Sequence, residues 1–460
     1  MYILIDILNI KQAIIDQATS GKLSKHFESD VDIKLLISVL PAPTSRREKL
    51  LKQKSEIEDE LFEIPSYWAW VKLGEISSYG DTAIKTLAKD LDADAWVLEL
   101  EDIDVGGKII RKTRVETRKP IGEKTVFRNG QLLYSKLRPY LKKVLVADED
   151  GVSTPELICL DVFCGINTKY IKLCLTNSWV DKVVNKRAYG IKMPRVDAGF
   201  MVNLPIPLPP IEEQNRIVDK VEEILAVLDH IDSLQSQYAT NVEVLKCKLI
   251  DAGIRGKLTE QLPEDGDAEA LHNQIQDEKA RLIKESKIKK DKPLGDITEE
   301  EMPFEIPKNW KWVRFGDLMK NRDSERVPVS VADRKKLKKI YDYYGASGVI
   351  DKVENYLFDS KLLLIGEDGA NLVSRSTPIA FIANGKYWVN NHAHVLDYYA
   401  EDYLDFVMYY INSISLLPYV TGSAQPKLNQ DNMNRIPVPL PPIAEQKRIV
   451  KRLNAIIAQL

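Results

Sequence analysis

The sequence predicts an α+β protein in which two domains of mixed α/β structure are joined by two long antiparallel helices, a coiled coil, in a pseudo-twofold cyclic repeat. Three observations lead to this fold class. Short segments recur almost unchanged in the two halves of the chain, heptads of apolar residues follow one of them, and the two chain ends complete each other. Repeats and periodicity of this kind are strong predictors of architecture.

The recurring segments set the order of the elements. PLPPIEEQNRIV at 207–218 and PLPPIAEQKRIV at 439–450 are identical at ten of twelve positions. Two further pairs are FEIPSYWAWVKLGEI (62–76) with FEIPKNWKWVRFGDL (304–318), and IDQATSGKL (15–23) with IDAGIRGKL (250–258). Each full unit runs from a tryptophan-rich segment through a variable middle to PLPP, a long helix and GKL. One unit is split between the two chain ends.

The helix that follows the first PLPP carries a coiled-coil seam, because its apolar residues recur in heptads. We predict this helix over 211–252, with only Gln235 interrupting its seam. The seam residues are Ile217, Val221, Ile224, Leu228, Ile231, Tyr238, Val242, Leu245 and Leu249. The C-terminal segment begins the same seam with Ile449, Leu453, Ile456 and Leu460, and the N-terminal segment continues it with Ile3, Ile7, Ile10 and Ile14.

The two terminal segments together match the central helix in length and pattern, except for one missing heptad. We therefore expect them to lie antiparallel to the central helix and to close the repeat. Two unrelated helical hairpins are the alternative interpretation.

These signals divide the chain into seven segments. They are the C-terminal part of the split helix (1–26), a charged helical linker (27–61), domain 1 (62–206), the central helix (207–258), a second charged helical linker (259–303), domain 2 (304–438) and the N-terminal part of the split helix (439–460). Pro205, Pro207, Pro209 and Pro210 predict an extended, stiff approach to the central helix, since proline is tolerated in a first helical turn.

The middles of the two domains share little sequence, which indicates one scaffold presenting two different specificities. Short strands are expected around Asn129-Gly130 in domain 1, and around Gly369 and Asn384-Gly385 in domain 2, because Asn-Gly is a turn signal. Helical spacing follows at 170–184 and 403–414. We expect two compact α+β domains of about 130 residues each.

Bulk composition narrows the class of protein. The net charge of -3 and the pI of about 6.1 argue against coating nucleic acid through overall charge, but leave room for local basic surfaces. Cys159, Cys164, Cys174 and Cys247 lack metal-binding spacing, and so few thiols favour a reducing compartment. No apolar run approaches the roughly 20 residues of a bilayer span, and the N-terminus lacks the basic region of a signal peptide. We expect a cytoplasmic protein without a membrane segment.

The chain resembles the specificity subunits of Type I restriction-modification systems. The resemblance rests on the duplicated PLPP segments, the W-x-W-V segments, the split helix, LLYSKLRPYLKKVLV (132–146), GEDGANLVSRSTPIAFIANGKYWVNNHAHVL (366–396) and GSAQPKLNQDN (422–432). It implies that domains 1 and 2 are target recognition domains, each reading one half of a bipartite asymmetric DNA site. It also implies that the helices set the spacer between the half-sites and dock methyltransferase subunits.

The resemblance further implies the partners and cofactors. The partners would be double-stranded DNA, two methyltransferase subunits and restriction/translocase subunits, with S-adenosylmethionine, ATP and Mg used by the partners and no cofactor bound by this chain. The chain would be non-catalytic, within a holoenzyme that is a site-specific endonuclease and adenine methyltransferase.

Three alternatives stay open at this point. They are a subunit of a methyltransferase-only or Type IIB-like system, a protein-only adaptor, and a self-contained nuclease or methyltransferase. The last lacks sequence support, because nucleotide-binding loop, nucleophile-elbow and N-P-P-[FY] motifs are missing, and no D…E-x-K array accompanies Glu367 and Asp368.

Two basic stretches of domain 1 are candidate DNA contacts, because arginine can pair with guanine while lysine and serine suit phosphates. The first stretch comprises Ser135, Lys136, Arg138, Tyr140, Lys142 and Lys143. The second comprises Lys186, Arg187, Tyr189, Lys192 and Arg195, around Gly190. A solvated strand edge is the alternative for the first stretch.

The candidate contacts of domain 2 include amide side chains, which can pair with adenine. They are Ser374, Arg375, Asn390, Asn391, Gln425 and Lys427. His392 and His394 suggest a metal ligand pair, but no third ligand has suitable spacing, so we expect a structural role and no metal. The basic run RKKLKK at 334–339 is either a solvated face or a phosphate contact.

Overall fold

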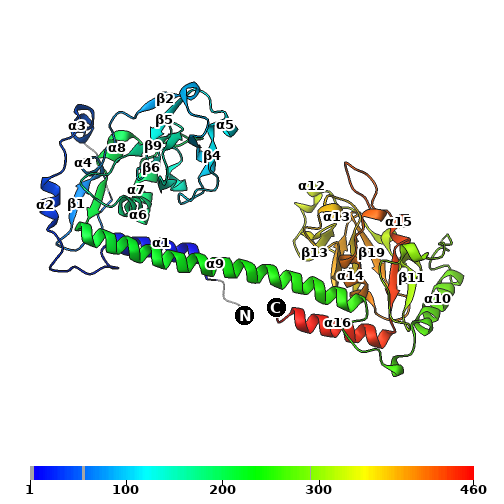
Figure 1. Cartoon of the computed structure of the whole chain (residues 1–460). Helices are drawn as coiled ribbons and strands as arrows, with labels where there is room; N and C mark the ends of the chain where they lie inside the picture. Colours follow the sequence, from blue (N-terminus) through cyan, green and yellow to red (C-terminus); the bar gives the residue numbers. More distant parts are fainter. Residues whose placement is uncertain (1–4, 54–56, 58, 291) are drawn as a thin grey trace. The chain divides into compact units, whose positions relative to one another are not determined.

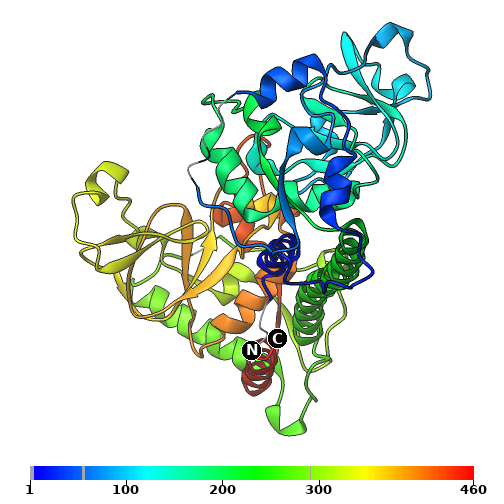
Figure 2. The ribbon, with the colours of Figure 1, turned by 90° about the vertical axis from the view of Figure 1, so that its left-hand side faces the viewer.

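We describe the chain from a computed structural model, shown in Figures 1 and 2, that covers residues 5–53, 57, 59–290 and 292–460. The chain divides into two compact units, the first ending at Ser236 and the second beginning at Gln237. Helix α9 (Ile211–Ile254) contributes its first part to one unit and its last part to the other. Within the described residues, no helix combines the length and apolar character needed to cross a membrane.

The first unit contains domain 1 and the segments that precede it. Its helices are α1 (Ile7–Thr19), α2 (Ile33–Ser38), α3 (Ser45–Leu51), α4 (Leu73–Ile76), α5 (Val115–Arg118), α6 (Thr168–Thr176), α7 (Ser178–Arg187) and α8 (Ala198–Val202). Its strands are β1 (Ala69–Lys72), β2 (Lys85–Leu87), β3 (Trp96–Leu98), β4 (Thr113–Arg114), β5 (Glu123–Phe127), β6 (Leu132–Ser135), β7 (Val144–Val146), β8 (Gly151–Ser153), β9 (Leu157–Leu160) and β10 (Pro205–Leu208).

The second unit contains domain 2 and the last helix. Its helices are α10 (Ala268–Lys284), α11 (Phe315–Leu318), α12 (Val331–Arg334), α13 (Asn371–Ser374), α14 (Leu404–Ser413), α15 (Gln430–Asn434) and α16 (Ile443–Ile457). Its strands are β11 (Lys311–Arg314), β12 (Lys320–Asn321), β13 (Tyr341–Gly345), β14 (Gly348–Val353), β15 (Phe358–Asp359), β16 (Leu362–Gly366), β17 (Ala380–Ala383), β18 (Lys386–Val389), β19 (Ala393–Asp397) and β20 (Pro437–Leu440).

Besides a two-stranded sheet described below, each domain holds two larger sheets with a core between them. Domain 1 has the strand orders β2-β5-β8-β3-β4 and β7-β6-β9, and domain 2 has β14-β13-β18-β15 and β12-β19-β16-β17. Trp96, Phe127 and Leu133 are fully buried between the two sheets of domain 1. The predicted α+β class is therefore confirmed, with two separate mixed domains.

The Asn-Gly turns do not form the hairpins that their flanking strands suggested. Gly130 adopts φ +83° between β5 and β6, but β5 pairs with β2 and β8 while β6 pairs with β7 and β9. Gly385 likewise links β17 and β18, which lie in different sheets. In both domains this turn therefore connects a strand of one sheet to a strand of the other sheet.

The tryptophan segment and the PLPP segment of each domain form a two-stranded sheet. β1 pairs antiparallel with β10, and Trp70 lies opposite Pro207. β11 pairs with β20 in the same register, with Trp312 opposite Pro439. The prolines before α9 were predicted only as a stiff extended segment. The structure shows that Pro205 and Pro207 lie in a paired strand, which proline permits at a sheet edge, and that Pro209 and Pro210 follow it.

Helix α1 lies beside the first part of α9, as Figures 1 and 2 both show. Gln235 accepts a hydrogen bond from the Ile5 backbone N–H at 2.9 Å, Lys11 pairs with Asp229, and Ser24 donates to Glu213 at 2.5 Å. The partner numbers fall along α9 as they rise from Ile5 to Ser24, which establishes the antiparallel direction. Gln235 interrupts the apolar seam because its amide serves the backbone of Ile5.

The predicted seam is well packed at its two ends and open between them. Ile217, Val221, Leu228 and Ile7 are buried, and Ile224, Ile231, Val242, Leu249, Ile14 and Ile456 are half-buried. In the second unit Ile449 and Leu453 are buried beside Gly253 of α9. Tyr238 and Leu245 are each 42% exposed, so the prediction of a continuous seam was wrong there. Ile10 is 37% exposed, and Ile3 lies outside the described residues.

Other sequence-based boundaries shift by local capping. The helix expected over 170–184 is two helices, α6 and α7, because Asn177 ends the first and caps the second through the Val180 backbone N–H. The described residues of the first linker form the short helices α2 and α3, whereas the second linker forms the seventeen-residue α10.

Candidate nucleic-acid interface

Each domain is fixed to its helix by the same set of contacts, which we call the anchor. The domain 1 anchor consists of Gly21, Trp68, Glu213 and Arg216 with Asp30, and the domain 2 anchor consists of Gly256, Trp310, Glu445 and Arg448 with Asp265. Members of the two anchors occupy equivalent positions of the sequence repeat. The repeat therefore encodes a duplicated interface between a domain and a helix, in addition to duplicated helices.

A buried glutamate lies at the centre of each anchor. The indole N–H of Trp68 donates to Glu213 at 3.2 Å, and that of Trp310 donates to Glu445 at 2.9 Å. Both glutamates are fully buried, so the indole N–H compensates part of the cost of removing a carboxylate from water. Because the tryptophan begins the domain and the glutamate begins the helix, this hydrogen bond ties one to the other.

An arginine–aspartate pair closes the edge of each anchor. The guanidinium of Arg216 contacts both oxygens of Asp30 at 2.9 and 2.7 Å, and that of Arg448 contacts both oxygens of Asp265 at 2.7 and 2.5 Å. The hydrogen bonds from arginine hold the pKa of each aspartate below its ordinary value. Bidentate pairs of this kind fix geometry as well as charge.

His26, Asp30 and Glu213 are close enough to suggest a metal site in the domain 1 anchor. Two observations favour a structural role for this group. Asp30 and Glu213 are already bound by Arg216 and Trp68, and the position of His26 is occupied in domain 2 by Gln261, whose amide donates to Glu445 at 2.8 Å. Both anchors therefore place a hydrogen-bonding side chain at this position.

Between α7 and α8, domain 1 forms a loop at residues 189–195 that we call exit loop 1. The backbone groups of Tyr189 and Arg195 exchange two hydrogen bonds of 2.9 Å, and the Arg138 N–H donates to the Pro194 carbonyl at 2.7 Å. Gly190 has φ +99°, a conformation that favours glycine. These bonds place exit loop 1 beside the segment that follows β6, so the two predicted basic stretches of domain 1 meet in the folded chain.

Domain 2 repeats this arrangement in exit loop 2, residues 421–427. Thr421 and Lys427 exchange backbone hydrogen bonds of 2.9 and 2.8 Å, and the Gly369 N–H donates to the Pro426 carbonyl at 3.0 Å. Gly422 has φ +84°. The sequence comparison of the two middles missed this equivalence, although Gly190 and Pro194 correspond to Gly422 and Pro426 when the PLPP segments are aligned.

Five of the predicted contact residues of domain 1 present exposed side chains at this junction. They are Arg138, Tyr140, Arg187, Tyr189 and Lys192. In the part of the chain that the structure describes, no ion-pair partner is found for Arg138, Arg187 or Lys192. Cations that are exposed and uncompensated are suited to an external phosphate.

Other predicted contacts of domain 1 have partners inside the protein. Lys136 and Arg195 both lie near Glu156, at 3.8 and 2.9 Å, and the hydrogen bond from Arg195 lowers the pKa of that carboxyl group. Lys186 lies 3.5 Å from Asp59. These three side chains remain at the surface, where a phosphate could compete for them.

Three predicted DNA contacts of domain 1 bond to groups inside the protein. We therefore leave them out of the candidate DNA interface. Ser135 is 3% exposed and donates to the Leu137 carbonyl at 2.8 Å. Lys142 donates to Gln12 of α1 at 2.8 Å and pairs with Asp181 of α7 at 3.2 Å. Lys143 donates to the Leu100 carbonyl at 2.7 Å. Sequence position alone could not reveal these internal bonds.

In domain 2, Ser374, Asn391 and Gln425 are exposed, and Lys427 pairs with Glu367 at 3.1 Å. Asn390 is 5% exposed, and its side chain accepts a hydrogen bond from the His392 N–H at 2.8 Å, so it serves the turn before β19. In the basic run, Arg334 and Lys339 both bond to Asp351, at 2.9 and 2.7 Å, which favours a structural face for these two residues.

A buried charge cluster lies beneath exit loop 2. His394 is 2% exposed, and its ring contacts Asp323 at 2.6 Å and the Leu428 carbonyl at 2.8 Å. Glu367 contacts Arg326 at 2.7 Å as well as Lys427. Burial lowers the pKa of His394, but the hydrogen bond and charge of Asp323 outweigh burial and raise it above its ordinary value. His392, by contrast, is a surface partner of Asp368 at 2.9 Å.

Arg375, predicted as a DNA contact, caps a helix in the structure. Its guanidinium donates to the carbonyls of Ile411 and Asn412 at 3.2 and 2.7 Å, at the C-terminal end of α14. Burial lowers the pKa of Arg375, so its environment is poorly hydrated. Cations near the last carbonyls of a helix satisfy acceptors that have no partner within the helix.

We therefore expect Arg375→Ala to act on stability, lowering the free energy of unfolding of the second unit by about 2 kcal/mol. Hydrogen exchange of α14 amides is the measurement, and Ser374→Ala, at the exposed neighbouring position, is the control. If Arg375→Ala shows the same hydrogen exchange as Ser374→Ala but binds DNA more weakly, Arg375 is a DNA contact after all.

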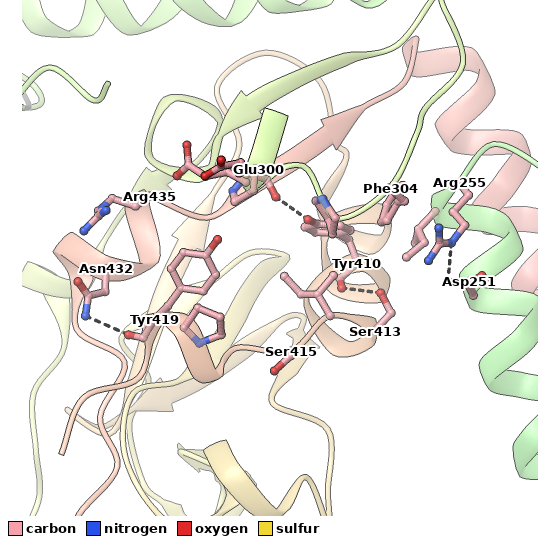
Figure 3. Close-up of a pocket in the computed structure, with 16 residues that line it drawn as sticks. Asp251, Arg255, Glu300, Phe304, Tyr410, Ser413, Ser415, Tyr419, Asn432 and Arg435 are labelled. Atoms are coloured by element: carbon pink, nitrogen blue, oxygen red, sulfur yellow. Dashed lines mark hydrogen bonds and ion pairs between the residues drawn. The ribbon is translucent and has the colours of Figure 1, made fainter. Parts of the chain in front are cut away.

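A cleft of about 560 Å³ lies in the second unit between the end of α9, the segment before β11 and the chain that follows α14. Figure 3 shows Arg255 beside Asp251 at one side and Asn432 near Tyr419 at the other. Arg255 pairs with Asp251 at 2.7 Å, and Asn432 donates to the Tyr419 carbonyl at 3.0 Å. At both sides of the cleft, polar side chains thus already have partners within the protein, an arrangement typical of structural contacts.

Ile191 and Met193, in exit loop 1, were not singled out from the sequence. Their relative exposures are 103% and 51%. The sequence does hold a signal that could have identified them: two apolar residues flank Lys192 in a segment without helical or strand periodicity.

Two unlike α/β domains on equivalent anchors, each with a pinned loop at its edge, define a duplicated scaffold for two-part recognition. Residues 307–460 match the family described as "Type I restriction modification DNA specificity domain". The chain is thus similar to the specificity subunits of Type I restriction-modification systems.

Relatives named as specificity subunits match most of the chain. The Type I restriction enzyme EcoAI specificity subunit of Escherichia coli is 27% identical over 370 residues, which cover 68% of this chain and 62% of that protein. The EcoEI specificity subunit of Escherichia coli is 24% identical over 97% of this chain and 88% of that protein. This chain thus spans less than two thirds of the first relative's length and most of the second's.

A solved structure supports the fold. A chain from a study of complex assembly and conformational transition of the type I R-M system aligns with a TM-score of 0.61 and 18% identity. The alignment covers 87% of this chain and 92% of that one.

Proposed function

We propose that this chain is the sequence-reading subunit of a Type I restriction-modification complex, in which domains 1 and 2 each bind one half of a bipartite asymmetric DNA site. The observation that carries the proposal is the pair of equivalent anchors presenting two unlike domains. A scaffold that repeats its attachment but varies what it presents is suited to reading two different sequences. The relatives named as specificity subunits support the same function.

The proposal assigns the chemistry to partner proteins. Two methyltransferase subunits would dock on the helices and linkers, and restriction/translocase subunits would complete the complex in the cytoplasm. S-adenosylmethionine, ATP and Mg would belong to these partners, while this chain would contribute binding and positioning without a catalytic residue. The exposed cations of domain 1 would contribute to phosphate and base contacts.

The proposal is tested by expressing the chain with its methyltransferase subunits and mapping methylated adenines in the genome of the expressing cell. We expect one motif with two specific parts separated by a spacer of fixed length. Replacing domain 2 with that of another member of the family should change one part and leave the other. Methylation by the chain without partners, or a motif in one uninterrupted block, would contradict the proposal.

Arg138→Ala is the sharpest single substitution for the DNA interface. Arg138 follows β6, is exposed and lies beside exit loop 1, so its removal should weaken binding to the cognate site about tenfold or more. Arg128→Ala is the matched control, because Arg128 is also exposed but precedes β6, at the other end of the strand. Equal effects of the two substitutions in a titration of labelled duplex would remove Arg138 from the interface.

A further inference from the structure

Exit loop 1 presents a fully exposed isoleucine at its tip. Ile191 has a relative exposure of 103%, and the neighbouring Tyr189 and Met193 are 61% and 51% exposed. Isolated apolar residues are common on protein surfaces. A set of three on one seven-residue loop presents a larger apolar surface to an external partner than a scattered side chain does.

The loop is held in place by the backbone and does not depend on the apolar tip for its structure. The two hydrogen bonds between Tyr189 and Arg195 close a narrow loop with a single antiparallel bridge, and the bond from Arg138 to Pro194 pins the loop to the domain. Gly190 allows the close return of the chain, since a Cβ there would lie 3.2 Å from the Met193 carbonyl oxygen. Little conformational freedom remains to be lost when the tip meets a ligand, which favours binding.

The charges around the tip indicate a polyanion as the ligand. Arg138, Arg187 and Lys192 are exposed, and none has an ion-pair partner among the described residues. The nearby acid, Glu156, is already occupied by Arg195. An apolar tip flanked by free cations suits DNA, in which phosphates border a groove that contains apolar groups.

The shape of the loop selects the groove. A narrow loop with an isoleucine at its tip enters the major groove, which is about 12 Å wide, more readily than the minor groove, which is about 6 Å wide. The C5 methyl of thymine is the apolar group that the major groove displays on a base edge. Exit loop 2 has the same backbone bonds but carries Ser423, Ala424 and Gln425, so its tip is suited to hydrogen bonding.

We propose that Ile191 enters the major groove of the domain 1 half-site and packs against the C5 methyl group of a thymine. Ile191 is then a specificity-determining residue, and the half-site of domain 1 contains at least one A·T pair. This inference rests on the proposed function.

The test removes the methyl group from the DNA and the side chain from the protein in turn. Affinities are measured by fluorescence anisotropy for the chain assembled with its methyltransferase subunits, on duplexes in which each thymine of the mapped half-site is replaced by deoxyuridine. One replacement should weaken wild-type binding about fourfold, and Ile191→Ala should weaken binding to the unmodified site about tenfold. In Ile191→Ala the sensitive replacement should change the affinity less than twofold. Ile121→Ala is the matched control, because Ile121 is an 86% exposed isoleucine elsewhere in domain 1.

The outcomes separate this inference from the proposed function. Absence of any sequence-specific binding by the wild-type complex defeats both. Specific binding with a half-site composed only of G·C pairs, or with no thymine sensitive to loss of its methyl group, defeats the inference alone. So does a deoxyuridine penalty that persists at full size in Ile191→Ala. An equal loss of affinity for cognate and unrelated DNA would show a contact with the phosphate backbone, or with a protein partner, in place of the thymine contact.

Discussion

Gly256→Ala is expected to destabilise the second unit by about 3 kcal/mol through two additive causes. Gly256 adopts φ +68°, a left-handed conformation that costs an alanine about 1 kcal/mol. An added Cβ would also lie 3.0 Å from Trp310 Cζ2 and against the ring of Pro307. Trp310 belongs to the anchor of domain 2 and Pro307 lies three residues before it, so the clash should loosen the attachment of the domain to α9.

The two causes can be separated within the same unit. Gly385 has φ +78° but no atom within 4 Å of its virtual Cβ, so Gly385→Ala should show the backbone cost alone. Hydrogen exchange of β11 and β20 amides in the full chain measures the stability of the anchor. Equal losses in the two variants would show that the close contact is relieved by movement of Pro307.

The equivalent glycine of the first unit, Gly21, provides an independent test of the same effect. Gly21 has φ +76°, and a Cβ there would lie 2.5 Å from Pro65 Cγ and 3.3 Å from Trp68 Cζ2. Gly21→Ala should therefore destabilise β1 and β10 by a similar amount. A large effect at Gly256 with none at Gly21 would contradict the equivalence of the two anchors.

His394→Leu should have a comparable effect, about 3 kcal/mol, because it removes the buried partner that contacts Asp323 at 2.6 Å and leaves Arg326, at 3.5 Å, as the nearest cation. The Asp323 carboxylate also accepts a hydrogen bond from the Val395 N–H at 2.7 Å, so it cannot leave the site without disturbing β19. Restoring charge balance with His394→Leu/Asp323→Asn should recover part of the loss. His392→Ala, which removes an exposed partner of Asp368, should cost less than about 1 kcal/mol.

The same cluster predicts a pH dependence with a definite sign. The folded-state pKa of His394 is raised, so its contribution to stability is complete below its unfolded pKa of about 6.5. That contribution is lost as the pH rises through the higher folded pKa. The pKa of Asp323 is raised by burial but lowered overall by His394, so its contribution is lost as the pH falls through the folded value, below about 4.

Exchange protection of β16 and β19 should consequently be greatest between these limits and should decline on the alkaline side in wild type. His394→Leu should lack the alkaline decline. A wild-type profile that rises above neutral pH would show that His394 is neutral in the folded protein.

The amino-acid sequence determined those features that depend on repeated local patterns. The duplicated PLPP and W-x-W-V segments predicted two equivalent domain boundaries, and the heptads predicted α9 with its two terminal partners. Alternation and turn signals were enough to predict mixed α/β domains, because they report which faces of short elements are apolar. They could not assign β5 and β6 to different sheets, since strand pairing depends on contacts distant in sequence.

Only the tertiary structure decided which polar residues are available for recognition. Arg138 and Arg375 are both arginines in loops after a central strand, yet the first is exposed and the second caps α14. The physical reason is that a side chain's availability depends on acceptors supplied by elements far away in the chain. The same reason applies to exit loop 1. Its place beside the segment after β6 depends on backbone hydrogen bonds between residues distant in sequence, such as the bond from Arg138 to Pro194.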